Sequence, residues 1–144
     1  MNNNKIEPKI VYNFLKSQPL ATVSTVNEDG NPESALVGFG EKEDLTLIIG
    51  TNKSTRKYKN ILKNPKVALA IGFGNEMITV QYEGIAEFMP DDEEGGYKKL
   101  YYAKNPSAQK YESDVGQTYF KIIPKWIRYT DFNKEPEEIF EITF

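Results

Sequence analysis

The chain has 144 residues and a net charge of −3, from 18 Lys and Arg against 21 Asp and Glu, and it contains neither histidine nor cysteine. The lack of cysteine excludes disulfides, thiolate nucleophiles and cysteine-ligated zinc or iron–sulfur centres. The lack of histidine removes the commonest general base and metal ligand, and it excludes a Ser-His-Asp triad. We therefore expect no metal site, and we expect any chemistry to depend on a bound cofactor or on carboxylates, tyrosines and lysines.

The bulk composition is typical of one globular domain over residues 1–144. Hydrophobic residues make up 39% of the chain, and no apolar run approaches the roughly 20 residues of a membrane-spanning helix. Residues 1–5 are followed by no apolar stretch, so we expect no signal peptide. These features predict a cytoplasmic protein that does not bind a membrane.

In chain order, the first half predicts one helix and three strands. Apolar residues spaced along one helix face predict a helix over residues 6–17. Alternating patterns rich in β-branched residues then predict strands at residues 20–26, 32–39 and 45–51. Because short polar turns join these strands, we expect them to pair with one another as an antiparallel meander.

The second half predicts two helices and five strands. The first helix is expected to begin at Ser54 or Thr55, which can cap it, and to end near Lys63. Its inward-facing residues are expected to be Tyr58, Ile61 and Leu62. The second helix is predicted at residues 91–103, and the strands at residues 67–73, 77–88, 118–123, 126–132 and 139–144.

Two features of these later strands bear on the architecture. The strand at 67–73 is apolar on both faces, which predicts a central position in the sheet, and Gly84 is expected to introduce a bulge or bend into its own strand. Pro124 is expected to separate the strands at 118–123 and 126–132. Six or more antiparallel strands with helices around them predict a mainly β, closed or nearly closed barrel.

The segment between residues 53 and 66 is basic. It contains no acidic residue and six basic ones, which are Lys53, Arg56, Lys57, Lys59, Lys63 and Lys66. Such a run is either a solvated helix face or an anion site. Arg56 and Lys57 fall in the first turn, where cations oppose the helix dipole unless an anion lies among them and the free backbone N–H groups. A phosphate group would satisfy all of these donors at once.

Four motifs in this order resemble the FMN-binding split barrels of the pyridoxine/pyridoxamine 5′-phosphate oxidase superfamily. They are Thr51-Asn52, Thr55-Arg56-Lys57, Asn64-Pro65 and Val67-Ala68-Leu69, and the similarity continues through residues 78–87 and 119–132. The resemblance implies a six-stranded antiparallel split β-barrel with flanking helices. It also implies a homodimer that binds two FMN molecules between its subunits.

The resemblance also implies a set of cofactor contacts. Arg56 and Lys57 would hold the FMN phosphate, with Thr55 capping the helix beside it. Gly50 and Thr51 would lie near the phosphate or the ribityl chain.

Further contacts would come from three other strands. The isoalloxazine ring would lie along the strand that contains Ala35, Leu36, Val37 and Gly38. Thr79 would approach the flavin, and Thr130 would reach it from the partner subunit, with Trp126 as an alternative contact or else a core or interface residue. No catalytic residue is indicated, although Tyr82 could deliver protons.

The chain departs from the vitamin oxidases of this superfamily at several positions. Ala35 and Gly40 stand where those enzymes have an Arg and a Lys, and Asn105 stands where a substrate-phosphate Arg is expected. A late Arg-x-His motif is missing, because the chain has no histidine. The sequence thus predicts an FMN-binding oxidoreductase of the short, general-stress type, with an unassigned small-molecule substrate and without efficient vitamin oxidation.

Other functions compete with this hypothesis. A non-catalytic flavin carrier or sensor would share the same motifs, and a relative that binds deazaflavin or haem stays possible, although haem is disfavoured by the lack of histidine. A module for single-stranded nucleic acid would use the basic helix. Such modules spread basic residues along a groove, whereas here they cluster and the net charge is −3, so we expect no nucleic-acid partner.

Overall fold

The computed structural model describes residues 6–72, 74–89 and 96–144. The strands are β1 (Leu20–Val26), β2 (Pro32–Gly38), β3 (Gly40–Glu41), β4 (Leu47–Asn52), β5 (Lys66–Ile71), β6 (Ile78–Phe88), β7 (Gln117–Asp131) and β8 (Glu138–Thr143). The helices are α1 (Ile6–Ser17), α2 (Arg56–Lys63) and α3 (Tyr97–Lys104), and a 3₁₀ helix, η2, spans Pro106–Tyr111. Among the described helices none is both long and apolar enough to cross a membrane.

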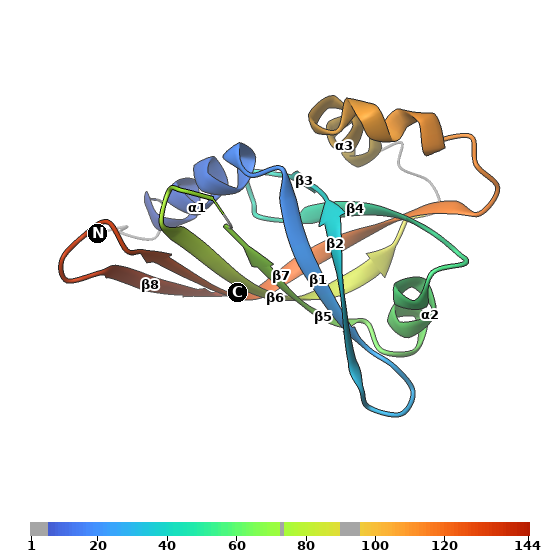
Figure 1. Ribbon diagram of the computed structural model, residues 1–144, viewed down its shortest axis with the longest axis horizontal. Coiled ribbons are helices and arrows are strands. Elements are labelled where there is room, and N and C mark those ends of the chain that lie inside the picture. Colours follow the sequence, from blue (N-terminus) through green and yellow to red (C-terminus); the bar gives the residue numbers. More distant parts are fainter. Residues whose placement is uncertain (1–5, 73, 90–95) are drawn as a thin grey trace.

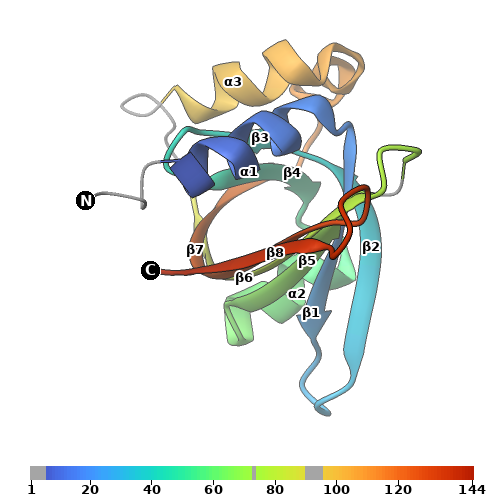
Figure 2. The ribbon, with the colours of Figure 1, turned by 90° about the vertical axis from the view of Figure 1, so that its left-hand side faces the viewer.

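The strands form one antiparallel sheet that curls into a barrel (Figures 1 and 2). Neighbouring strands follow the order β2-β1-β5-β6-β7-β4-β3, with β8 paired to β7. Only Phe39 separates β2 from β3, so the two ends of this order are joined by the chain itself. If β2 and β3 are taken as one strand, they form a six-stranded split barrel with β1, β4, β5, β6 and β7, and β8 extends it. The predicted mainly β fold is confirmed.

Helices lie on two sides of this barrel. Figures 1 and 2 show α1 and α3 on one side of it and α2 on the opposite side. The predicted helix over residues 6–17 is α1, which buries Val11, Phe14 and Leu15. Of the helix predicted at 91–103, residues 91–95 lie outside the described ranges, and the remainder corresponds to α3.

The predicted meander of the first three strands is confirmed only in part. β1 and β2 form the expected hairpin, and β4 pairs with the two-residue β3 that continues β2, but along its whole length β4 pairs with β7, with Gly50 opposite Tyr119. The strand also starts two residues later than predicted, because Leu45 has a left-handed φ of 70° and ends the β3–β4 turn. Each strand edge offers equivalent backbone hydrogen bonds, so the choice of a partner distant in sequence depends on packing of the whole barrel.

Pro124 does not divide the late strands as predicted. β7 runs unbroken for 15 residues from Gln117 to Asp131. The register shifts between Glu83 and Gly84 of β6, so that Gly84 faces Pro124, and the missing N–H of the proline falls at an irregularity of the ladder. The expected bulge at Gly84 is confirmed, and a Cβ there would lie 2.6 Å from the Ile123 carbonyl oxygen.

Two predictions of burial need correction. In α2 the buried positions are Asn60 and Ile61, whereas Leu62 is 58% exposed, because the helix turns its polar Asn60 toward the β1–β2 hairpin. β5 lies between β1 and β6, as predicted, but only one of its faces is buried in the chain. Ala68 and Ala70 on its other face are exposed, because no described element covers the outside of the sheet there.

Candidate functional site

The loop from β4 into α2 is held by local hydrogen bonds. Asn52 Oδ1 accepts a hydrogen bond from the Ser54 N–H at 2.9 Å, and its carbonyl accepts one from the Thr55 N–H at 3.0 Å. Thr55 is the N-cap, and its Oγ1 accepts a hydrogen bond from the Tyr58 N–H at 3.3 Å. The predicted cap at Thr55 is therefore confirmed, and Arg56 begins the helix.

The two hydroxyl groups beside this loop are engaged with each other. Thr51 Oγ1 lies 3.0 Å from Thr55 Oγ1, and the Thr55 hydroxyl donates to the Asn52 carbonyl at 2.8 Å. With the Thr55 proton used in this way, Thr51 is left to donate to Thr55. The donors described at this helix start that remain for a ligand are the backbone N–H groups and the side chains of Arg56 and Lys57.

A cavity of about 170 Å³ opens where the N-terminus of α2 meets β1 and β2. Its lining residues are Val23, Thr25, Glu33, Ser34, Ala35, Thr55, Arg56 and Lys57. The structure thus brings together four of the predicted contacts, Ala35, Thr55, Arg56 and Lys57, from segments about twenty residues apart. The first-turn N–H groups and two cations give this cavity the chemistry of an anion site.

Lys57 is half-buried in the wall of this cavity. Burial lowers the pKa of its ammonium group, because the charged form loses hydration. Across the described ranges, none of the ion pairs involves Lys57. A half-buried cation without a carboxylate partner is stabilised when an anionic ligand binds next to it.

Arg56 has an acidic partner. Its Nη1 donates to Glu33 Oε2 at 3.0 Å, and the other oxygen of Glu33 accepts from Asn60 Nδ2 at 2.8 Å. The buried Asn60 amide also donates to Thr25 Oγ1 at 2.9 Å. Sequence analysis missed Glu33 and Asn60, because no local pattern relates a carboxylate on β2 to an arginine 23 residues later.

The other predicted contacts on β2 and β4 do not line the cavity. Val37 is buried in the core, and Leu36 on the opposite face of β2 is 61% exposed. Gly38 and Gly50 are covered by α3: a Cβ on Gly38 would lie 2.5 Å from Asn105 Oδ1, and the Gly50 backbone hydrogen-bonds the Tyr101 hydroxyl.

Thr79 and Thr130 lie opposite each other on β6 and β7. They are not among the residues that line the cavity. Thr79 is on the same face of β6 as the exposed Gln81, which is the outer face of the sheet. Trp126 is on β7 opposite Glu83, and its Nε1 donates to Glu141 Oε2 at 3.4 Å. Within one chain, these three residues are not brought to the phosphate end of the candidate site.

Tyr82 is not placed to deliver protons to a ligand. It is 1% exposed, and its hydroxyl donates to the carbonyls of Leu45 and Ile122 at 2.8 and 3.0 Å. Burial raises the pKa of this hydroxyl far above its ordinary value. The expectation for Tyr82 is therefore wrong, and the residue belongs to the barrel core.

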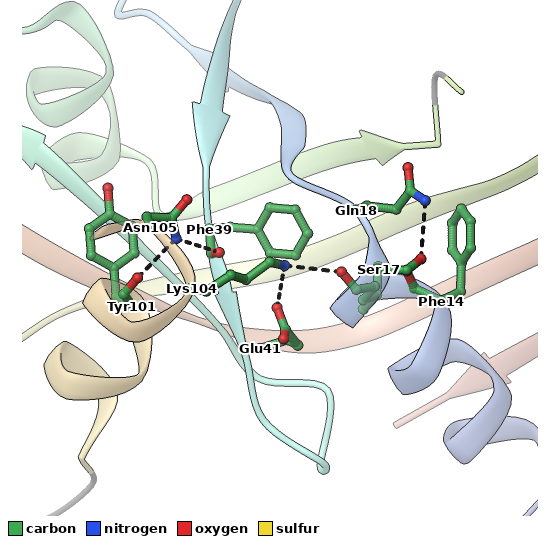
Figure 3. Close-up of polar contacts among 9 residues, drawn as sticks. Phe14, Ser17, Gln18, Phe39, Glu41, Tyr101, Lys104 and Asn105 are labelled. Carbon is green, nitrogen blue, oxygen red and sulfur yellow. Dashed lines mark hydrogen bonds and ion pairs between the residues drawn. The ribbon is translucent and has the colours of Figure 1, made fainter. Parts of the chain in front are cut away.

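Asn105, at the position of the expected substrate-phosphate arginine, ties α3 to the junction of β2 and β3. Its Nδ2 donates to the carbonyls of Phe39 and Tyr101, both at 2.9 Å (Figure 3). The neighbouring Lys104 is paired with Glu41. In the parts of the chain that the structure describes, no three carboxylates are grouped to hold a metal ion.

Comparisons with known proteins agree with this architecture. A family described as pyridoxamine 5′-phosphate oxidase matches residues 8–131. An uncharacterised protein of Methanocaldococcus jannaschii is 32% identical over 97 residues, which cover 64% of this chain and 62% of the relative.

Among solved structures, General Stress Protein 26 from Bacillus anthracis has a TM-score of 0.71 at 23% identity, covering 99% of this chain and 100% of that one. A haem binding protein from Mycobacterium smegmatis has a TM-score of 0.80 at 15% identity, covering 94% of this chain and 57% of that one. This chain thus spans less than two thirds of the length of the archaeal relative and of the haem binding protein. At these identities the two structures show the fold alone. The match over residues 8–131, together with the split barrel, shows that the chain belongs to the pyridoxamine 5′-phosphate oxidase family.

Proposed function

We propose that this protein binds FMN between two copies of the chain and acts as an oxidoreductase on a small molecule. The observation that carries the proposal is Lys57, a half-buried ammonium that has no ion-pair partner among the described residues and lies in a cavity at a helix N-terminus. Arg56 lies beside it and adds a second cation. Together they provide the charge and the backbone donors that a phosphomonoester needs.

The size of the cavity supports a second copy of the chain. Its volume of about 170 Å³ is below the ~300–1,000 Å³ of typical ligand pockets, so this cavity alone has room for the phosphate end of a flavin but not for the whole cofactor. On the outer face of the sheet, Leu36 of β2, Thr22 of β1 and Ala70 of β5 lie side by side on neighbouring strands. Thr22 and Ala70 are small and uncharged, and no described element covers this face, so a second copy of the chain can pack closely against it.

The roles of the chain's own residues follow from their positions. Arg56 and Lys57 bind the phosphate, and the backbone of β2 orients the ring. Among the described strands, β2 has a ladder partner on one side only, β1, so alternate N–H and C=O groups on its other edge are available to the polar edge of a flavin. When bound, the flavin supplies hydride or electron transfer, and the protein supplies binding and orientation.

The absorption spectrum of the purified protein tests this proposal. Bound oxidised flavin gives visible bands, and quenching of FMN fluorescence measures affinity for added cofactor. A Soret band instead would favour haem, the ligand named for one structural neighbour. A colourless protein that fails to quench FMN fluorescence would refute flavin binding. Tight FMN binding without turnover of NADH, NADPH or pyridoxamine phosphate would favour a flavin carrier.

Variants connect the spectrum to the site. Lys57→Gln should weaken FMN binding about tenfold or more while leaving riboflavin binding unchanged, because only FMN carries the phosphate. Lys59→Gln removes the same charge from an exposed position two residues later and serves as the matched control. Equal effects of Lys57→Gln on FMN and riboflavin would argue against a phosphate contact.

A further inference from the structure

Glu33 is the fixed member of its ion pair with Arg56. The Glu33 side chain is 17% exposed, whereas that of Arg56 is 75% exposed. Asn60 holds the carboxylate from the other side at 2.8 Å, and the same amide is bonded to Thr25, which is 1% exposed. The carboxylate is therefore anchored to the barrel wall, and the long arginine side chain reaches it from solvent.

This carboxylate changes the charge of the candidate phosphate site. Arg56, Lys57 and Glu33 all line the same cavity, so the cavity carries one net positive charge rather than two. A phosphomonoester carries about −1.5 to −2 charges near neutral pH. Glu33 therefore opposes the binding of a dianion in two ways, by occupying Arg56 and by repelling the ligand across a partly desolvated cavity.

We propose that Glu33 determines the specificity of this subsite, an inference that rests on the proposed function. In the ligand-free protein Glu33 takes the place of a phosphate on Arg56, so that inorganic phosphate and other small anions bind poorly. A phosphomonoester attached to a ring system is accepted, because contacts between the ring and β2 contribute the free energy that the phosphate alone lacks. Glu33 lowers the affinity of the subsite for every phosphate, so that a small anion alone leaves it empty at concentrations at which the whole cofactor still binds.

The alternative role for Glu33 predicts an effect of opposite sign. If the carboxylate orients Arg56 toward the phosphate, its loss should weaken FMN binding. The geometry favours competition, because a single Nη1–Oε2 contact of 3.0 Å joins the two groups and the carboxylate itself is part of the cavity wall.

The test compares Glu33→Gln with the wild-type protein. Glutamine keeps the size of the side chain and an oxygen that can accept the Asn60 hydrogen bond. We expect FMN to bind about tenfold more tightly to E33Q, measured by fluorescence quenching, and riboflavin to bind equally to both proteins. We also expect inorganic phosphate to raise the thermal midpoint of E33Q and to leave that of the wild type unchanged.

Glu28→Gln is the matched control. Glu28 pairs at 2.6 Å with Lys63 of α2, the helix that begins at Arg56, but Glu28 does not line the candidate phosphate cavity. E28Q should change FMN affinity less than twofold. Glu33→Ala is the second variant, for use if E33Q folds poorly. It also removes the carboxylate from Arg56, so we expect it to strengthen FMN and phosphate binding as E33Q does.

Two results would overturn the inference. One is unchanged or weaker FMN binding by both Glu33 variants when the wild-type protein binds FMN, and the other is a lack of phosphate-dependent stabilisation in both. The phosphate measurement also separates this inference from the proposed cofactor. If no protein binds FMN but phosphate stabilises E33Q alone, the role of Glu33 in anion selection holds and the FMN assignment fails.

Discussion

Lys104 of α3 and Glu41 of β3 form an ion pair of 2.5 Å whose side chains are only 16% and 6% exposed. The Lys104 ammonium also donates to the Leu15 carbonyl at 3.0 Å and lies 3.6 Å from the centroid of the Phe39 ring (Figure 3). One cation therefore joins α3 and the C-terminal part of α1 to the point where β2 passes into β3. Burial lowers the pKa of Lys104, and the contact with Glu41 opposes that shift.

Removing the acidic partner should destabilise the protein strongly. Glu41→Gln leaves a buried ammonium without its counter-charge, which we expect to lower the free energy of unfolding by about 3 kcal/mol. Urea unfolding measures the change. The control is Glu87→Gln, because Lys121 and Glu87 form a 3.4 Å pair with side chains 32% and 54% exposed, and its loss should cost less than about 1 kcal/mol. Similar losses for both variants would show that burial of the Lys104 pair is unimportant.

The difference in unfolding free energy between the wild-type protein and the Glu41→Gln variant should become smaller as the pH rises. Without Glu41, burial lowers the pKa of Lys104 further, while the unfolded chain keeps the ordinary value. The unfolded state then binds more protons than the folded state, so the stability of the variant increases with pH. Unfolding curves of both proteins from about pH 8 to about pH 10 should converge. A constant or widening gap would contradict a buried, charged Lys104.

Replacing Lys57 should stabilise the ligand-free protein and at the same time weaken FMN binding. Its pKa is lowered by burial, so its charged form is disfavoured in the ligand-free fold. Lys57→Met keeps the length of the side chain without the charge, and should raise the thermal midpoint by about 2 °C after allowance for solvent screening. The same variant should bind FMN at least about tenfold more weakly. Lys59→Met should change neither property, and a destabilised Lys57→Met would indicate that the ammonium has a structural partner.

The oligomeric state of a variant tests whether the outer face of the sheet is the dimer interface. Ala70 is exposed at the centre of this face, between Thr22 of β1 and Gln81 of β6. Ala70→Arg should convert a dimer into monomers, because a long charged side chain prevents close packing of two sheet faces. Light scattering after size exclusion measures the mass. Val115→Arg, at a position 98% exposed, is the control. An Ala70→Arg protein that stays dimeric would place the interface elsewhere.

The elements predicted correctly are those encoded over a few neighbouring residues. The apolar spacing in residues 6–17 produced α1, and the hydroxyl of Thr55 capped α2 as expected. Caps and helix periodicity act over one or two turns, so a short segment contains the information. Leu62 was placed wrongly, because an eight-residue helix has one buried stripe and its direction depends on the hairpin that it covers.

Strand pairing required information from the whole chain. β4 pairs along its whole length with β7, whose residues follow almost seventy positions later, and it meets the continuation of the β1–β2 hairpin only at the two residues of β3. The same limit applies to Pro124, whose effect on β7 depends on a bulge at Gly84 in the neighbouring strand. Backbone hydrogen bonds are chemically alike on every strand edge, so local composition does not select the partner.

By itself, the sequence determined the residue types available for chemistry, the helix start at Thr55-Arg56-Lys57 and the family to which these motifs belong. Only the tertiary structure decided which groups share a cavity. It placed Glu33 against Arg56 and left Lys57 half-buried without an acidic partner among the described residues. The reason is physical: the charge of a site is the sum over side chains that folding brings within a few ångströms, and here they come from two separate segments, β2 and the start of α2.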